Sequence, residues 1–157
     1  MAENPRVPYT IGGLPAHPLI VHAVVVLIPL SALGAVAVAI RAGWNRPYAP
    51  LVAAGAVVSA ITATMAELAG DALLDTINVS PAYVALLDEH GRFGVYTMYA
   101  SWVFAVVAVA TAVLGRRGSG AASRALGWVS AVVGLVAVIL VVITGHLGST
   151  SVWGTVG

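Results

Sequence analysis

The sequence predicts an all-α membrane protein, a bundle of four antiparallel transmembrane helices, from three observations. Of its 157 residues, 60% are hydrophobic and only 8% are charged, whereas a soluble domain averages about 25% charged residues. Four segments are each apolar over about 20 residues, the length that spans a bilayer. Glycine, proline and arginine gather between these segments. We expect one four-helix membrane domain covering residues 1–157.

The four expected spans are about 18–40, 49–70, 92–115 and 125–147. The stretch RAGWNRPYAP separates the first two spans, and GRRGSGAASR separates the last two. Both connections are short, so each pair should form an antiparallel helical hairpin. Small residues recur within the spans, and in lipid they let helix backbones approach closely. The bundle should therefore be compact, and no internal repeat is evident.

The middle connection, residues 71–91, is predicted to be an outer loop that carries a short helix. Ser80 followed by Pro81 is typical of a helix start, with serine at the N-cap and proline at the first helical position. This amphipathic helix either runs into the third span or bends at Gly91.

The arginines predict the orientation of the chain in the cell membrane. The sequence has no lysine, and the loops 41–46 and 116–124 hold five of its seven arginines, whereas all six acidic residues belong to the other face. By the positive-inside rule the arginine loops are cytoplasmic. The N-terminus, the C-terminus and the acidic middle loop are then expected outside.

Composition also excludes several classes of function. The absence of cysteine rules out disulfides, iron–sulfur clusters, thiolate metal sites and covalently attached c-type haem within this chain. Neither a phosphate-binding loop, a nucleophile elbow nor a zinc-protease motif is present. The net charge of +1 gives no reason to expect binding to nucleic acid.

Antiparallel threading places all four histidines at the outer face. His17 and His22 open the first span, His90 opens the third and His146 closes the fourth. Measured along the helix from the nearest cytoplasmic arginine, His22 lies at roughly 28 Å, His146 at 33 Å, His17 at 36 Å and His90 at 39 Å. His22 is therefore the deepest, and the set falls within about two helical turns.

The two histidines of the first span should have different roles. Five helical residues turn by about 500°, so their rings point about 140° apart. We expect His17, directly before Pro18, to cap or support the helix at the rim, and His22 to face the site. Glu67 and Asp71 end the second span at the same face, which completes a polar layer supplied by all four helices.

Glycines accompany these polar residues. Gly94 follows His90 by four positions, Gly145 and Gly148 flank His146, and Gly70 precedes Asp71. Missing side chains beside a ring provide room for a planar cofactor, and they equally favour ordinary close packing of helices.

Three motifs, LPAHPLIVHAVVVLIPL, EHGRFG and TGHLGSTSVWG, make the chain similar to a bacterial, largely actinobacterial, family of membrane proteins known as domain of unknown function 2231. The resemblance covers almost the whole chain, and HPLIVH followed by Pro29 is its most specific part. It implies a four-span fold. Relatives joined to Rieske-type or c-type cytochrome domains imply membrane redox chemistry, for which this chain would need a separate partner protein or a larger respiratory complex.

The first functional hypothesis is a small membrane protein that binds haem b through paired histidines and transfers electrons near the outer face, rather than a stand-alone enzyme. Imidazole is a suitable axial ligand of haem, and a four-helix bundle is a suitable host. The axial pair stays open: His17 or His22 with His90, or His22 with His146.

Two alternatives stand beside haem. One is a non-haem zinc, copper or iron site, for which imidazole and carboxylate are suitable ligands; its candidate ligands are His22, His90, His146, Glu67 and Asp71. The other is an accessory or structural subunit of a larger membrane complex without a cofactor, its histidines serving interface hydrogen bonds or pH sensing.

Overall fold

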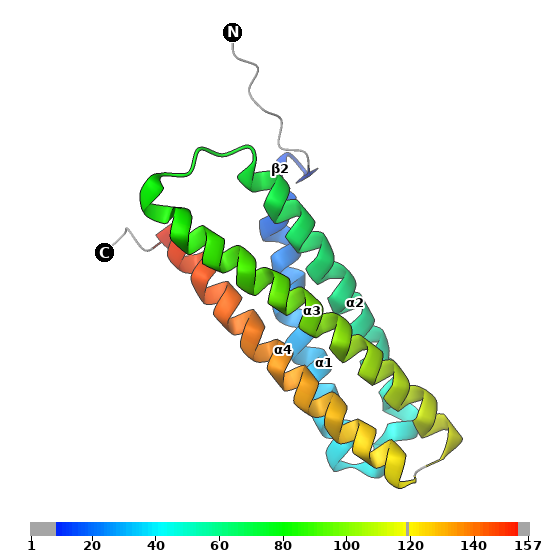
Figure 1. The fold of residues 1–157 in the computed structure, drawn as a ribbon. Coiled ribbons are helices and arrows are strands. Elements are labelled where there is room, and N and C mark those ends of the chain that lie inside the picture. The colour runs from blue at the N-terminus through cyan, green and yellow to red at the C-terminus, as the bar shows by residue number, and fades with distance from the viewer. Residues whose placement is uncertain (1–8, 119, 154–157) are drawn as a thin grey trace.

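The computed structural model describes residues 9–118 and 120–153, and four long helices make up most of this part of the chain (Figure 1). Each is long and apolar enough to cross a membrane. The predicted all-α bundle of membrane-spanning helices is therefore confirmed. The helices are α1 (Ala16–Ile40), α2 (Asn45–Leu74), α3 (Pro81–Arg117) and α4 (Ala121–Trp153).

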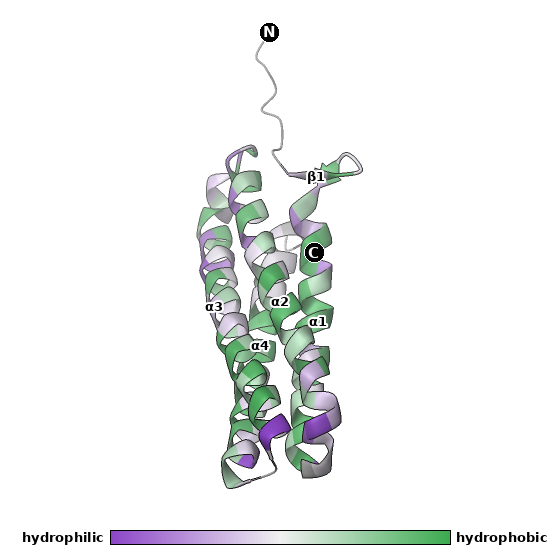
Figure 2. Cartoon of the chain, turned by 90° about the vertical axis from the view of Figure 1, so that its right-hand side faces the viewer, coloured by the Kyte–Doolittle hydropathy of each residue, from purple (hydrophilic) through white to green (hydrophobic). Residues whose placement is uncertain are grey.

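Each helix packs against two neighbours around the bundle. The extensive contacts are α1 with α2, α2 with α3, α3 with α4 and α4 with α1, so α1 and α3 are diagonal to each other. A short 3-10 helix, η1 (Ala42–Trp44), joins α1 to α2. Hydrophobic residues dominate the middle of the bundle, and hydrophilic residues gather toward its two ends (Figure 2). This distribution fits helices that cross a lipid bilayer.

The helices extend beyond the predicted spans, most of all at the middle connection. Pro81 is the first residue of α3, and the helix continues without a break through Gly91 to Arg117. Of the two predicted alternatives, the continuous helix is confirmed. The predicted loop 71–91 is correspondingly too long, because only residues 75–80 lie outside the helices. Ser80 has the extended backbone of an N-cap, although its side chain makes no capping bond.

A small β-hairpin precedes α1 and was not foreseen from the sequence. Strand β1 (Thr10–Ile11) pairs antiparallel with β2 (Leu14–Pro15). The two turn residues, Gly12 and Gly13, have φ values of 59° and 81°, as a two-residue type I′ turn requires. The hairpin continues into the helix, because the Ala16 N–H donates to the Tyr9 carbonyl at 2.9 Å.

The core is built mainly from small residues, as predicted. Alanines dominate the buried set, and Phe104 and Ile28 are the largest side chains that are fully buried. Phe104 lies against Gly134, where an added Cβ would be 3.0 Å from the ring. Close approach of helix backbones is the usual basis of packing in lipid. The helices of this bundle therefore contact one another through small side chains and backbone atoms rather than through large side chains.

Candidate histidine site

His17 in the first turn of α1 makes a hydrogen bond to the neighbouring helix. Its Nδ1 lies 2.7 Å from the Ala66 carbonyl oxygen of α2. The ring rests on Gly70, where an added Cβ would lie 2.9 Å from Nδ1, too close for any side chain. Of the two roles expected for His17, capping is wrong because the N-cap residue is Pro15, whereas the bond from its ring to α2 supports the start of the helix.

His90 on α3 repeats this arrangement with α4. Its Nδ1 lies 2.9 Å from the Thr144 carbonyl oxygen, and its ring rests on Gly148, where an added Cβ would lie 2.8 Å from Cε1. In both hairpins, therefore, the first helix supplies the histidine. The second helix supplies a carbonyl group and, four residues later, the glycine that makes room for the ring.

The two rings meet across the bundle diagonal. The centroids of His17 and His90 are 6.1 Å apart, and the ring planes are inclined at 86°. A backbone carbonyl can only accept a hydrogen bond, so Nδ1 of each ring must carry a proton. In the neutral form of each ring, Nε2 then keeps its lone pair. The structure thus brings together two oriented imidazoles, each with one basic nitrogen not used in these bonds.

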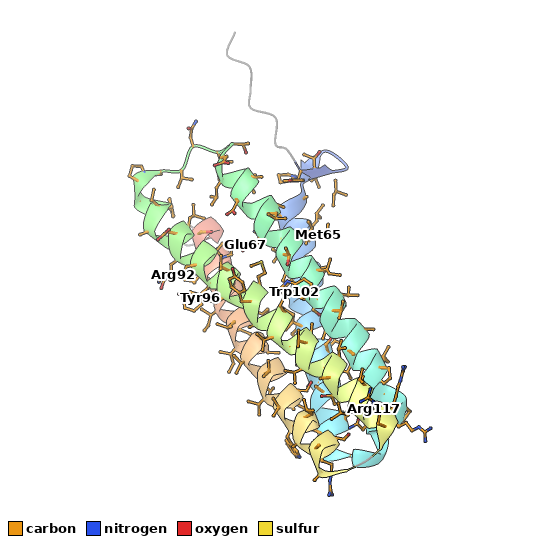
Figure 3. All side chains as sticks on the ribbon, turned by 45° about the vertical axis from the view of Figure 1, so that its right-hand side comes forward. Met65, Glu67, Arg92, Tyr96, Trp102 and Arg117 are labelled. Atoms are coloured by element: carbon orange, nitrogen blue, oxygen red, sulfur yellow. The ribbon has the colours of Figure 1, made fainter. Side chains whose placement is uncertain are left out.

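Glu67 adds a carboxylate at the seam between α2 and α3, where Figure 3 shows it in the half of the bundle away from Arg117. Its side chain is half-buried and lies against Gly94, where an added Cβ would be 2.6 Å from Oε2. Gly94 follows His90 by one helical turn, so the carboxylate and the His90 ring occupy adjacent levels on α3. A third glycine thus makes room for a polar side chain of the neighbouring helix.

Two threonines border the site toward the membrane centre. The hydroxyl groups of Thr97 and Thr144 are 2.9 Å apart, so one donates to the other, and the accepting hydroxyl donates its own proton to a carbonyl of its helix. Thr144 is the residue whose carbonyl holds His90. The hydroxyl contact therefore joins α3 to α4 next to the ring.

The remaining predicted site residues lie on the surface of the bundle. His22 is exposed, and its Nδ1 contacts the Pro18 carbonyl of its own helix. His146 and Asp71 are exposed as well. The predicted angle of about 140° between His17 and His22 allows only one of them to face inward, and packing on Gly70 selects His17. The expected polar layer supplied by all four helices is reduced to His17, His90 and Glu67.

This placement also bears on the predicted metal ligands. Within residues 9–118 and 120–153, no three histidine, aspartate or glutamate side chains form a group that could hold a metal ion. The set His22, His90, His146, Glu67 and Asp71 is therefore not assembled in the structure.

Gly70 and Gly148 stood out in the sequence, but the carbonyl groups of Ala66 and Thr144 that hold the two histidine rings did not. The signal available was the spacing: Ala66 and Gly70, like Thr144 and Gly148, are four residues apart and share a helix face. Each pair exposes one carbonyl beside one vacant side-chain position, which is what a ring from the neighbouring helix needs.

Comparison with known proteins places the chain in a family. The family model described as "Predicted membrane protein (DUF2231)" matches residues 13–156. Searches of the curated proteins and of the solved structures gave no match. Because the family match covers nearly the whole chain, including both histidines of the pair and all four helices, this protein belongs to the DUF2231 family of predicted membrane proteins.

Proposed function

We propose that this protein binds haem b between His17 and His90 and transfers electrons at that end of the membrane bundle. The observation that carries the proposal is the pair itself: two imidazoles from diagonal helices, 6.1 Å apart, each fixed through Nδ1 by a backbone carbonyl. Histidines that ligate metals nearly always donate their other ring N–H in this way, which orients the ring and raises the basicity of the ligating nitrogen.

The separation of the rings favours axial ligation over a tetrahedral site. With imidazole–metal bonds of about 2.0–2.1 Å, ring centroids on opposite sides of one ion lie about 6 Å apart, against about 5 Å in a tetrahedral site. The observed 6.1 Å between the centroids of His17 and His90 matches the first spacing and would suit a shared ion if the Nε2 atoms of both rings faced it. Bis-histidine ligation from facing helices is also a usual way for a four-helix bundle to hold a cofactor.

The location supports exchange of electrons with a separate protein. His17 lies in the first turn of α1, and α3 begins nine residues before His90, so the pair is near one end of the bundle. A Rieske-type or c-type cytochrome partner, or a larger respiratory complex, could approach this end from the aqueous phase. By the distribution of arginines, this end is the extracytoplasmic one.

A visible spectrum of the protein expressed with haem supply tests the proposal. The wild type should show a Soret band of six-coordinate, low-spin haem. His17→Ala or His90→Ala should abolish the band or convert it to a five-coordinate spectrum. His22→Ala and His146→Ala are matched controls, because they make the same chemical change at exposed positions, and they should leave the spectrum unchanged.

Two results would contradict the proposal in different ways. Absence of a Soret band in the wild type would remove haem, and metal analysis of the same preparation would then separate a non-haem zinc, copper or iron site from an accessory subunit without a cofactor. A haem spectrum that is lost in His22→Ala but retained in His17→Ala would keep haem and overturn the assignment of its ligands.

A further inference from the structure

The opposite end of the bundle holds a pocket that the histidine site does not involve. It has a volume of about 320 Å³ and lies where η1 and the start of α2 meet the end of α3. Three of its lining residues are arginines and three are glycines. The lining residues are Gly43, Asn45, Arg46, Gly115, Arg116, Arg117 and Gly118.

The positive charge at this end is not compensated by acidic side chains. Five of the seven arginines belong to the connections at this end, and the sequence places no aspartate or glutamate there. Within residues 9–118 and 120–153, the one ion pair joins Arg92 to Glu89, far from the pocket. The pocket arginines Arg46, Arg116 and Arg117 are exposed, so their guanidinium groups are available to an anion.

Helix stability does not explain the position of Arg46. It lies in the first turn of α2, where the helix dipole is positive and disfavours a cation. An anion bound beside it would offset this repulsion. Guanidinium groups also match the geometry of phosphate oxygens, to which they donate paired hydrogen bonds.

A buried amide next to the pocket lacks a donor. Asn45 is 7% exposed, and its Nδ2 donates to the Ser123 hydroxyl oxygen at 2.8 Å. Its Oδ1 lies against Gly115, another lining residue, and among the described residues it has no hydrogen-bond partner. A buried acceptor left unsatisfied is costly, and Gly115 covers this oxygen. A ligand hydroxyl group would supply the missing donor if the Asn45 side chain turned toward the pocket.

Aromatic residues mark the level of the lipid headgroups at the same end. Trp44 and Tyr48 are exposed, and their rings pack edge to face with centroids 5.3 Å apart. The guanidinium group of Arg41 lies over the Trp44 ring, 4.7 Å from its centroid. Tryptophan and tyrosine concentrate at membrane–water interfaces. The pocket lining includes Gly43 and Asn45, the sequence neighbours of Trp44, so the pocket belongs to the same interfacial region of the bundle.

From these features we propose that the arginine-rich pocket binds the headgroup of an anionic phospholipid, with its phosphodiester held by Arg46, Arg116 and Arg117. A phosphoglycerol headgroup suits both parts of the site, because its phosphate is an anion and its glycerol hydroxyl groups can donate to Asn45 Oδ1 once that side chain turns from Gly115 toward the pocket. The same phosphate chemistry could come from the aqueous phase as free phosphate, and the experiment separates these sources.

Displacement of a fluorescent phosphatidylglycerol from the full chain in zwitterionic detergent tests the proposal. The assay is run in 1 M NaCl, where the Debye length is about 3 Å and long-range attraction between charges is screened. Phosphatidylglycerol should compete about fivefold better than phosphatidylethanol, which has the same phosphodiester without hydroxyl groups, a ratio corresponding to one neutral hydrogen bond. Inorganic phosphate at lipid-equivalent concentration should not compete. Equal competition by both lipids would overturn the role of the hydroxyl groups, and efficient competition by phosphate would overturn the lipid as the ligand.

Paired substitutions test the pocket itself. Arg116→Gln with Arg117→Gln should weaken phosphatidylglycerol binding about 100-fold, from about tenfold for each charge-assisted hydrogen bond that is lost. Arg41→Gln with Arg124→Gln removes the same charge at the same end outside the pocket lining, and at high salt it should stay within about twofold of wild type. Equal losses in the two double variants would show attraction by surface charge alone and would overturn the site.

Discussion

Replacing Gly148 by alanine tests whether the glycine positions hold the histidine rings. The added Cβ would lie 2.8 Å from His90 Cε1, against 3.4–4 Å for ordinary contact, so the ring must shift by about 0.6 Å or more. Its Nδ1 is 2.9 Å from the Thr144 carbonyl oxygen, and a shift of this size away from that oxygen lengthens the hydrogen bond to about 3.5 Å, beyond its normal range of about 2.7–3.2 Å. Losing a partly buried bond of this kind costs about 1–3 kcal/mol.

The matched control is Gly145→Ala, three residues earlier on α4, where nothing lies within 4 Å of an added Cβ. Both alanines gain about 0.5–1 kcal/mol of helix stability relative to glycine, so this gain cancels in the comparison. The free energy of unfolding, measured by circular dichroism during SDS titration in mixed micelles, should therefore be about 1–3 kcal/mol lower for Gly148→Ala than for Gly145→Ala. Equal values for the two variants would refute the account of the ring contact.

Three further outcomes follow from the packing. Trp102→Phe removes the 3.0 Å bond from the indole nitrogen to the Thr64 hydroxyl, and it should lower the free energy of unfolding by about 1 kcal/mol; no change in an SDS titration would contradict the bond. Gly115→Ala places a methyl group on top of the Asn45 amide, and it should reduce the yield of folded protein in size-exclusion chromatography, so a wild-type profile would count against this packing. His22→Leu changes an exposed side chain and should leave the unfolding free energy within about 0.5 kcal/mol of wild type; a larger loss in the same titration would place His22 in the bundle.

Much of the fold follows from the sequence because hydropathy and the length of a bilayer crossing constrain each helix separately. The limits of α2 and α3 were missed by several residues, since a helix continues past the apolar region wherever propensity and neighbours permit. Asp71 suggested the end of the second helix, yet residues 71–74 are helical in the structure, and the helix predicted from Pro81 continues into the third span. The Gly12-Gly13 turn could have been recognised, because two glycines between short apolar pairs are typical of a hairpin.

The histidine pair was only partly predictable. The helical-rise estimate placed His17 and His90 at nearly the same level, roughly 36 and 39 Å from the arginines, and the helical angle allowed only one of His17 and His22 to face inward. Depth alone favoured His22. The choice of His17 depends on contact with Gly70, a relation between two helices that one-dimensional periodicity does not contain.

The bonds from His17 to Ala66 and from His90 to Thr144 indicate which parts of the chain position each ring. His17 is held within the hairpin of α1 and α2, and His90 is held within the hairpin of α3 and α4, so each ring is positioned by its own half of the chain. The 6.1 Å approach of the two rings and the contact of Glu67 with Gly94 need both halves. Each ring therefore has its hydrogen-bond partner within its own hairpin, and the pair of rings exists only where the two hairpins pack together.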